Sequence, residues 1–350
     1  MPALPQLIDA DRYQPCEWDL KADRRWLDYW VGVFVNHAES LMRSIAASYP
    51  DLAPQRLAEL RERYVATMRR FGECPEHFER IDILTLDAAR DELLRSCGVL
   101  DPFAAEKRRA NQAALALLPK WFSEIDQAPA SRRLELVCQG LLAGNMFDLG
   151  AAAAAACYQQ AGADFERIRS ALPPRPWLVD DVDRWAERWR DGGGYEHVAI
   201  FVDNAGPDFC LGCLGLARWC ALRGARVTLA ANERPALNDV TVREAADLLE
   251  QAGRADETLG RLVRERRVEV ISTGNHTPLI DLAHLAPDCV AHLADADLLV
   301  LVGMGRALES NYRARLACDA VRVAVLKDRM VARWLGGRLF DCILGLGPGV

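Results

Sequence analysis

Six short apolar runs in the second half of the chain constrain its fold more than any other feature. Helical patterns separate these runs, for example over residues 209–223 and 242–251. Strands that are apolar throughout and alternate with helices are typical of a parallel sheet covered on both faces. The sequence therefore predicts an α/β fold. The predicted strands cover residues 198–202, 226–231, 268–272, 298–302, 321–326 and 342–346.

The first half of the chain has a different pattern. Apolar residues recur there at steps of three and four, as in amphipathic helices. The stretch Ala171-Leu-Pro-Pro-Arg-Pro-Trp177 has three prolines in four positions, which forbids a helix and favours an extended linker. We predict a helical domain over residues 1–165, a linker over 171–180 and an α/β domain over 181–350. The predicted helices cover residues 26–46, 58–70, 84–96, 105–118, 133–146 and 149–161.

Charge and composition exclude several classes of protein. Acids outnumber bases 50 to 43, and the net charge of −7 argues against a non-specific nucleic-acid binder. The N-terminal residues lack the pattern of a signal peptide, so we expect none, and no uncharged apolar run is long enough to span a membrane. The 11 cysteines form no framework, so we expect reduced thiols in a cytoplasmic protein. The pair Cys210-Leu-Gly-Cys213 lies in an apolar helical pattern, which favours buried thiols over a zinc or redox site.

Polar residues collect where the predicted strands end. Ligands of open α/β sheets bind outside the carboxyl ends of the strands, so these residues together predict a site. In chain order they are Asp203-Asn204, Asn232-Glu233 with Asn238-Asp239, Thr273-Gly-Asn275, Gly303-Met-Gly-Arg306 and Lys327-Asp328.

Asp203, Asn204 and Asp239 are the candidate metal ligands. Carboxylate and amide oxygens suit Mg²⁺ or Mn²⁺ rather than zinc. Asp203 and Asn204 would lie in a strand-to-helix turn before Pro207, a residue that suits the first position of a helix. An ordinary turn is the alternative for this pair, and a helix N-cap is the alternative for Asp239. The capping box that begins at Thr241 leaves Asp239 available as a ligand.

Lys327 has two interpretations. It ends an apolar strand, so it is either a surface lysine whose head reaches water or a donor to phosphate.

Three other enzyme classes compete for this sequence. The run Leu298-Leu-Val-Leu-Val-Gly-Met-Gly-Arg-Ala-Leu308 resembles a dinucleotide-binding loop, with Asp328 near the expected position of a ribose-binding acid. Leu308 replaces the third glycine, however, and too little chain follows to complete such a domain. A haloacid-dehalogenase phosphatase would need an aspartate at Ala205, and a methyltransferase would need a glycine-rich loop after the first strand. All three are disfavoured.

Taken in order, the motifs of this chain resemble those of the metal-dependent damage-control phosphatases, a family first defined as a domain of unknown function. The closest subgroup includes the phosphatase domain fused to pantothenate-kinase-like proteins. The motifs are Gly144-Asn-Met-Phe-Asp-Leu-Gly150, Pro174-Arg-Pro-Trp177, Phe201-Val-Asp-Asn-Ala-Gly206, Ala231-Asn-Glu-Arg-Pro-Ala-Leu-Asn-Asp239, Gly303-Met-Gly-Arg306 with Glu309 and Asn311, Lys327, and Leu335-Gly-Gly-Arg-Leu-Phe-Asp341.

The resemblance implies a helical N-terminal part packed on a three-layer α/β/α domain with a mostly parallel sheet. It also implies one divalent cation (Mn²⁺, Mg²⁺, Co²⁺ or Ni²⁺) held by Asp203, Asn204 and Asp239. The implied activity is hydrolysis of a small phosphorylated metabolite, in this subgroup 4′-phosphopantetheine or its oxidised forms in coenzyme A metabolism. The residues expected to bind phosphate or substrate are Asn145, Asn275, Arg306, Asn311, Lys327 and Arg90.

Two departures from the subgroup affect the expected substrate. Val302 replaces a usual glutamate, and His276 replaces a usual aspartate. Both changes make the pocket less negative, which predicts tolerance for a more anionic substrate such as a sugar phosphate. The alternative is that Val302 only extends a buried strand and that His276 faces solvent. A non-catalytic protein that binds a phosphorylated metabolite is the second hypothesis for function.

Overall fold

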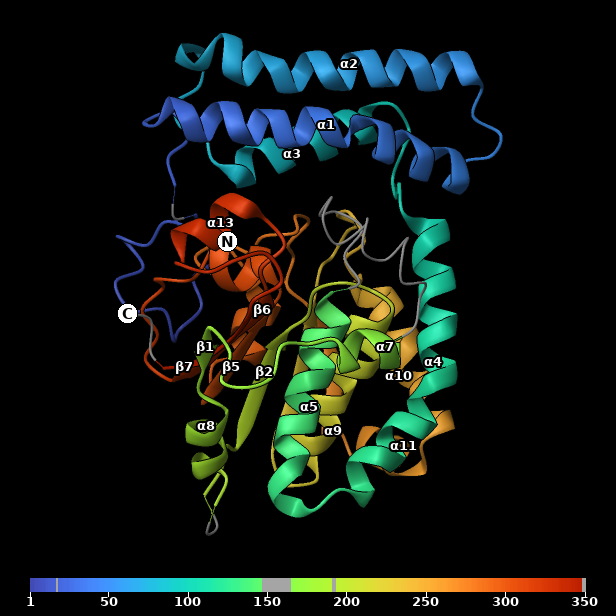
Figure 1. Cartoon of the computed structure of the whole chain (residues 1–350), viewed down its shortest axis with the longest axis vertical. Helices are drawn as coiled ribbons and strands as arrows, with labels where there is room; N and C mark the ends of the chain where they lie inside the picture. The colour runs from blue at the N-terminus through green and yellow to red at the C-terminus, as the bar shows by residue number, and fades with distance from the viewer. Residues whose placement is uncertain (17, 147–164, 191–192, 348–350) are drawn as a thin grey trace.

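The computed structural model describes residues 1–16, 18–146, 165–190 and 193–347 (Figure 1). Its centre is a seven-stranded sheet in the order β1-β7-β6-β5-β2-β3-β4. Neighbouring strands are parallel except β6 and β7, which are antiparallel, so the predicted α/β fold with a mostly parallel sheet is confirmed. The strands are β1 (Val179–Asp180), β2 (His197–Phe201), β3 (Arg226–Ala231), β4 (Val268–Ser272), β5 (Leu298–Val302), β6 (Asp319–Val325) and β7 (Cys342–Leu346).

Helices make up most of the first half of the described chain, as their amphipathic pattern predicts. The long ones are α1 (Arg24–Ser48), α2 (Pro54–Glu73), α3 (Ile83–Ser96), α4 (Ala104–Gln127) and α5 (Ala130–Asn145). The helix predicted at 149–161 lies outside the described residues. The remaining α-helices are α7 (Phe165–Ser170), α8 (Val182–Arg188), α9 (Leu214–Ala221), α10 (Val242–Ala255), α11 (Glu257–Arg264), α12 (Pro287–His292) and α13 (Arg329–Trp334), with a 3₁₀ turn, η1 (Pro75–His77).

Two π-helical segments follow strands of the sheet. The helix predicted over 209–223 begins as the π-helical segment η2 (Asp208–Cys213) and continues as α9. A second segment, η3 (Gly305–Glu309), follows β5. Single π-helical turns occur frequently at functional sites.

The two faces of the sheet bury two hydrophobic cores. Side chains alternate along a strand, so Val198 and Ile200 of β2 face one core while Ala199 and Phe201 face the other. Helices α4 and α5 contribute to the first core, and α1, α2 and α3 contribute to the second. Helices of the first half therefore share cores with the sheet, and the domain boundaries at residues 165 and 181 stay predictions.

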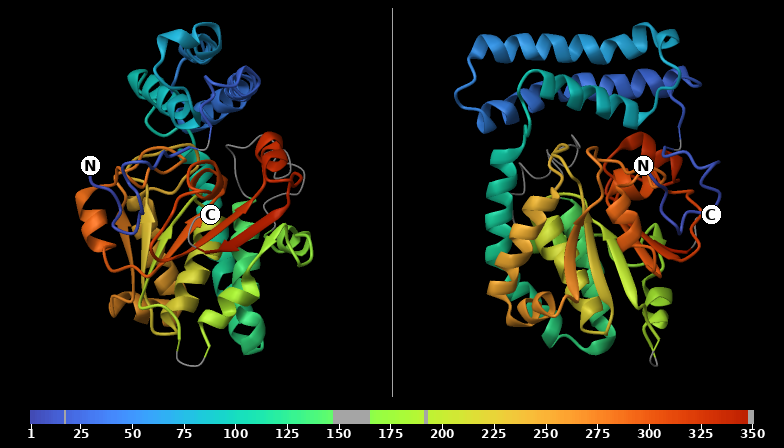
Figure 2. Two further views of the ribbon diagram at one scale, coloured as in Figure 1. Left: turned by 90° about the vertical axis from the view of Figure 1, so that its left-hand side faces the viewer. Right: turned by 180° about the vertical axis from the view of Figure 1, so that it is seen from behind.

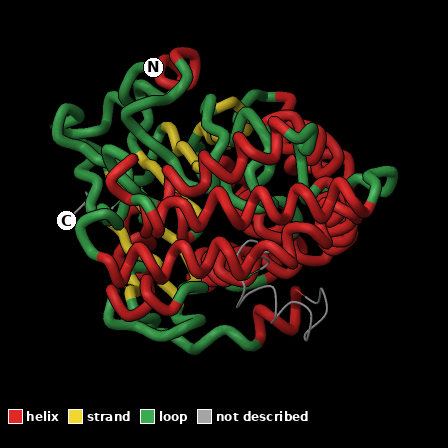
Figure 3. Tube along the Cα trace, turned by 90° about the horizontal axis from the view of Figure 1, so that it is seen from above, coloured by secondary structure: helices red, strands yellow, loops and turns green. Residues whose placement is uncertain are grey.

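Helices α1, α2 and α3 lie side by side across one end of the sheet (Figure 2). Seen from above, the long helices lie across the ends of the strands (Figure 3). Helix α4 descends from this layer along one side of the body, and α5 packs against η2 and α9 (Figure 1). The helical layer thus forms a roof above one end of the sheet.

Candidate active site

The loops after β2 and β3 bring the three predicted metal ligands together. Asn204 and Asp239 pair through an antiparallel backbone bridge. The Val240 N–H donates to the Asp203 carbonyl at 3.0 Å, and the Ala205 N–H donates to the Asn238 carbonyl at 2.9 Å. These bonds hold the two loops together, so Asp203, Asn204 and Asp239 are buried at one end of the sheet.

Arg306 joins the two carboxylates. Its Nη1 donates to Asp203 Oδ1, and its Nη2 donates to Asp239 Oδ2 at 2.6 Å. Burial lowers the pKa of Arg306, but the negative charges of Asp239 and Asp203 raise it more, so the guanidinium stays protonated. Asn232 adds a bond from Nδ2 to Asp239 Oδ2 at 3.0 Å. The sequence predicted Arg306 in the phosphate pocket, whereas the structure gives its donors to the candidate metal ligands.

Asn145 connects the helical half of the chain to this site, and its predicted contact with phosphate or substrate stays a prediction. Its Nδ2 donates to Asp203 Oδ2 and to Asp208 Oδ2, both at 3.0 Å. Lys327 Nζ donates to the Asn145 carbonyl at 2.9 Å and to its Oδ1 at 3.3 Å. A side chain at Gly144 could not fit, because its Cβ would lie 2.7 Å from the Asp208 Cα. This close approach of α5 to η2 places Asn145 between Asp203 and Lys327.

Asp208 is a site residue that the sequence analysis missed. It is fully buried at the start of η2, and its Oδ2 also accepts from Asn204 Nδ2 at 2.9 Å. Its Oδ1 has no hydrogen-bond partner. Burial, with the nearby charge of Asp203, raises the pKa of Asp208 to about 7. In the sequence, an acid directly after Pro207 looks like an ordinary residue of the first helical turn. Only its position five residues after Asp203 could have indicated that Asp208 belongs to the site.

Gly303 explains part of the Gly303-Met-Gly-Arg306 motif. Its φ of +93° suits glycine, and any Cβ at this position would overlap the Asp203 carboxylate. The motif thus allows the end of β5 to pass directly against the candidate metal ligand.

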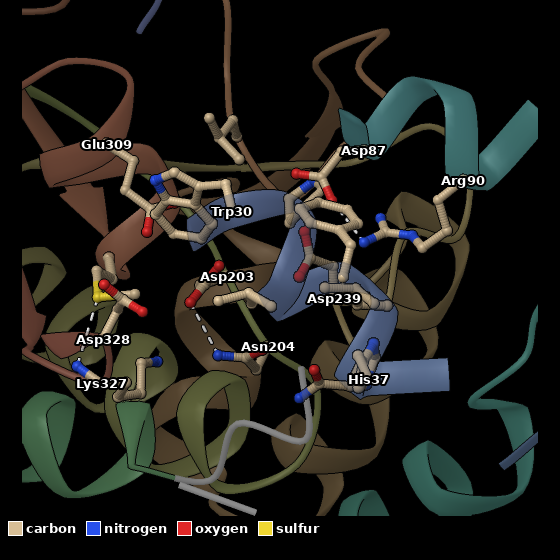
Figure 4. A pocket seen from close by; sticks show the side chains of 18 of the residues that line it. Trp30, His37, Asp87, Arg90, Asp203, Asn204, Asp239, Glu309, Lys327 and Asp328 are labelled. Atoms are coloured by element: carbon tan, nitrogen blue, oxygen red, sulfur yellow. Dashed lines mark hydrogen bonds and ion pairs between the residues drawn. The ribbon is translucent and has the colours of Figure 1, made fainter. Parts of the chain in front are cut away.

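A cavity of about 440 Å³ opens beside these residues (Figure 4). Its lining includes all three candidate metal ligands, Lys327 and Arg90. Helix α1 contributes Trp30, Val33, Phe34 and His37 to the same cavity, and α3 contributes Asp87. The sequence analysis identified none of these α1 residues. An amphipathic pattern predicts that one face of a helix is buried, but it does not predict whether that face contacts a core or a cavity.

Asn275 and Asn311 do not line the cavity. Asn275 Nδ2 donates to the carbonyls of Thr277 at 2.9 Å and Leu279 at 2.6 Å. Asn311 Nδ2 donates to the carbonyls of Ile280 and Arg306, both at 3.0 Å. Both asparagines therefore stabilise the loops around the site, and their expected contact with substrate stays a prediction.

Arg90 lies in a buried ion cluster on α3. Its Nη1 donates to Asp87 at 2.5 Å, and its Nε donates to Asp91 at 2.7 Å. Burial raises the pKa of Asp87 to about 7, even though the positive charge of Arg90 acts to lower it. Arg90 thus reaches the cavity as predicted, but two carboxylates already compensate its charge.

The two departures from the family pattern lie outside the cavity lining. Val302 is fully buried in the hydrophobic core on the α5 side of the sheet. The loss of the usual glutamate at position 302 could have freed Arg306 to bind an anion. Instead, Asp203 and Asp239 hold its guanidinium. Burial and the nearby Arg95 lower the pKa of His276, which leaves its ring neutral at pH 7. These contacts favour the alternative in which Val302 only extends a buried strand.

The Cys210 and Cys213 pair consists of buried free thiols, as predicted. Burial raises the pKa of both thiols. Neither has the lowered pKa of a reactive cysteine.

The chain belongs to the damage-control phosphatase family. Residues 36–343 match the family model described as the damage-control phosphatase ARMT1-like domain. The chain is 36% identical over 320 residues to damage-control phosphatase At2g17340 of Arabidopsis thaliana, covering 90% of this chain and 86% of the relative. The family resemblance noted from the motifs is therefore confirmed.

Longer proteins also contain a region similar to this chain. This chain is 33% identical to pantothenate kinase 2 of Arabidopsis thaliana, in a match that covers 98% of this chain. It is 29% identical to the 4′-phosphopantetheine phosphatase of Mus musculus, in a match that covers 97% of this chain. It spans only 41% and 48% of those two relatives. In fold, it resembles the crystal structure of a DUF89 family protein from Pyrococcus horikoshii, with a TM-score of 0.61, 18% identity, and coverage of 89% of this chain and 96% of that one.

Among the described residues, the structure contains no helix with the length and apolar character needed to cross a membrane.

Proposed function

We propose that this chain is a divalent-metal-dependent phosphatase that hydrolyses small phosphomonoesters. The observation that carries the proposal is the meeting of Asp203, Asn204 and Asp239 at one end of a cavity that Lys327 also lines. Membership of the damage-control phosphatase family supports the reaction class.

The donor set fits a hard divalent cation. Two carboxylates and one amide offer oxygen ligands of the kind that Mg²⁺ and Mn²⁺ prefer, and Co²⁺ and Ni²⁺ also accept them. The nitrogen of the Asn204 amide donates to Asp203 and Asp208, which leaves the amide oxygen to face a cation. Such a cation, when bound, would neutralise charge on the phosphoryl oxygens and lower the barrier to hydrolysis.

Side chains of the protein would bind and orient the phosphate. Lys327 carries the positive charge that a phosphate group requires, and Asn145 fixes the position of its Nζ. Arg306 neutralises part of the charge of Asp203 and Asp239, which limits the repulsion between these acids and an approaching dianion. Residues of the roof helices α1 and α3 line the same cavity.

The substrate that we propose is 4′-phosphopantetheine or one of its oxidised derivatives. The relative from Mus musculus is named a 4′-phosphopantetheine phosphatase, and this chain matches that protein over 97% of its own length. A sugar-phosphate phosphatase of the same fold is the alternative within this reaction class. A non-catalytic protein that binds a phosphorylated metabolite is the alternative outside it.

Phosphate release measured with a panel of cations tests the reaction class. We expect turnover of p-nitrophenyl phosphate and 4′-phosphopantetheine with at least one of Mg²⁺, Mn²⁺, Co²⁺ and Ni²⁺, and its loss with EDTA. Turnover without metal, or none with any of these ions, would contradict the proposal. Tight binding of 4′-phosphopantetheine without phosphate release at high protein concentration would favour the non-catalytic alternative.

A further inference from the structure

Helix α4 contacts both loops that carry the candidate metal ligands. It runs from the roof down one side of the body (Figure 1). The Nζ of Lys107, near the start of α4, lies 3.5 Å from the carbonyl oxygen of Asp239. One turn further along, Asn111 Oδ1 accepts from the Gly206 N–H at 2.6 Å, two residues after Asn204. Residues four apart lie on the same face of a helix, so one face of α4 meets both loops.

Lys107 is a buried cation between two carboxylates. Its side chain is 1% exposed, and its Nζ lies 2.7 Å from Asp101 Oδ2 and 2.9 Å from Glu244 Oε1. Glu244 belongs to the capping box of α10, in which its Oε2 accepts from the Thr241 N–H at 2.9 Å and from Thr241 Oγ1 at 2.8 Å. Thr241 lies two residues after Asp239. The lysine, the glutamate and the cap together therefore fix the backbone that carries this ligand.

Gly206 allows the other loop to lie directly against α4. Its φ is +77°, and a Cβ at this position would lie 2.8 Å from the Ala110 Cβ, closer than two such atoms can approach. The absence of a side chain brings the Gly206 N–H within reach of Asn111. The hydrogen bond to Asn111 thus restrains the turn that holds Asp203 and Asn204.

We propose that Lys107 and Asn111 are positioning residues that together fix the two loops in the geometry that binds the divalent cation. The inference rests on the proposed function, because that function supplies the cation. Backbone bonds hold the loops to each other, whereas α4 holds both loops to the body of the protein. Groups that orient metal ligands without touching the metal typically contribute about 10- to 100-fold to metal affinity.

Binding of Mn²⁺, followed by electron paramagnetic resonance, tests this positioning role. Lys107→Met keeps the length of the side chain and removes its charge, and Asn111→Leu removes the acceptor at nearly constant size. We expect each variant to raise the dissociation constant for Mn²⁺ about tenfold or more. Asn111→Asp keeps an acceptor oxygen and should stay within about threefold of the wild-type protein. Wild-type affinity in Lys107→Met or in Asn111→Leu would overturn the inference.

Arg218→Met is the matched control for the loss of a buried cation. Arg218 is also almost fully buried, and it pairs with Asp126 of the same helix α4 and with Asp256, the N-cap of α11. It lines a different cavity from the one beside the metal ligands. We expect this variant to lose stability but to bind Mn²⁺ within about twofold of the wild-type protein. A similar loss of Mn²⁺ affinity in Arg218→Met and Lys107→Met would indicate general destabilisation and overturn the inference.

Hydrogen exchange of the metal-free protein keeps this inference separate from the proposed activity. Lys107→Met should speed the exchange of the Thr241 amide, and Asn111→Leu that of the Gly206 amide, each by about tenfold or more, whereas Arg218→Met should change neither. If no ester is hydrolysed with any cation, the proposed function fails, and these exchange rates still decide whether α4 positions the loops. Unchanged exchange of both amides in Lys107→Met and Asn111→Leu would overturn the inference.

Discussion

Asp208 holds Asn204 by two hydrogen bonds. The Asp208 Oδ2 accepts from the Asn204 backbone N–H at 3.3 Å and from its Nδ2 at 2.9 Å. The same amide nitrogen donates to Asp203 Oδ2 at 2.8 Å. Since both acceptors engage the nitrogen, the amide oxygen of Asn204 is the atom that faces away from them. Asp208 therefore sets which atom of Asn204 is presented to a cation.

Asp208→Ala should weaken metal binding through this loss of orientation. We expect about 10- to 100-fold lower affinity for Mn²⁺, the usual cost of removing a group that orients a ligand. Titration of Mn²⁺ followed by electron paramagnetic resonance measures it. Asp208→Asn keeps an acceptor oxygen and should retain most of the affinity. Equal loss in both variants would show that the charge of Asp208 matters, not its hydrogen bonds.

The two carboxylate ligands should be essential for activity. Asp203→Asn and Asp239→Ala should each remove most of the phosphatase activity by weakening metal binding, because the first replaces a charged carboxylate by a neutral amide and the second removes the carboxylate altogether. Far-UV circular dichroism should stay unchanged. Normal turnover in either variant would reduce that carboxylate to a capping or turn residue.

Arg306 should contribute more to stability than to substrate binding. Arg306→Gln leaves Asp203 and Asp239 buried without their cation, and breaking a buried pair in this way costs about 3–5 kcal/mol of unfolding free energy. A bound divalent cation would compensate the same two charges. We therefore expect Mn²⁺ to raise the melting temperature of Arg306→Gln by more than it raises that of the wild-type protein. An equal rise in both proteins would argue that the cation does not lie between these carboxylates.

Lys327→Ala should mainly weaken the binding of phosphate esters. The loss of a charge-assisted contact costs on the order of 1–3 kcal/mol, so KM should rise and turnover should slow. Lys327 is almost fully buried, and Lys327→Met, which keeps the length of the side chain, controls for packing. Steady-state kinetics with 4′-phosphopantetheine measure the effect. An unchanged KM in both variants would assign Lys327 to holding Asn145 in place.

Most of the strands, and the meeting of the candidate metal ligands, could be predicted because their signals are local. The ranges predicted for β3, β4, β5 and β7 agree with the structure, since each is a short apolar run bounded by polar or turn residues. Asp203, Asn204 and Asp239 meet because parallel strands end at one edge of the sheet.

The roof and the inner contacts of the site could not be predicted in the same way. Trp30 meets the cavity through packing between segments far apart in the chain, and the amphipathic pattern of α1 specifies only that one face is buried. Asn275 follows a strand and Asn311 belongs to a family motif, but the amides of both satisfy nearby carbonyls, and neither residue lines the cavity. Asp208 looked like a first-turn acid, and its role depends on the close approach of α5 at Gly144.

The buried acid Asp87 should make the stability of the protein depend on pH. Burial raises its pKa in the folded protein to about 7, whereas an unfolded aspartate titrates near 3.9, at about the model-peptide value. Between these two values the folded state binds more protons than the unfolded state, so the free energy of unfolding falls as pH rises. The contribution of Asp87 is full below about pH 4 and is lost as pH passes through about 7. We expect the loss to be on the order of 2–4 kcal/mol.

Urea unfolding of the wild-type protein and of Asp87→Asn at pH 5, 6, 7 and 8 measures this contribution. The asparagine cannot titrate, so the wild-type protein should lose stability relative to Asp87→Asn as pH rises through this range. Asp51→Asn, which changes an exposed acid, should track the wild-type protein at every pH. A constant difference between the wild-type protein and Asp87→Asn would mean that Asp87 stays ionised down to pH 5, with Arg90 offsetting the cost of its burial.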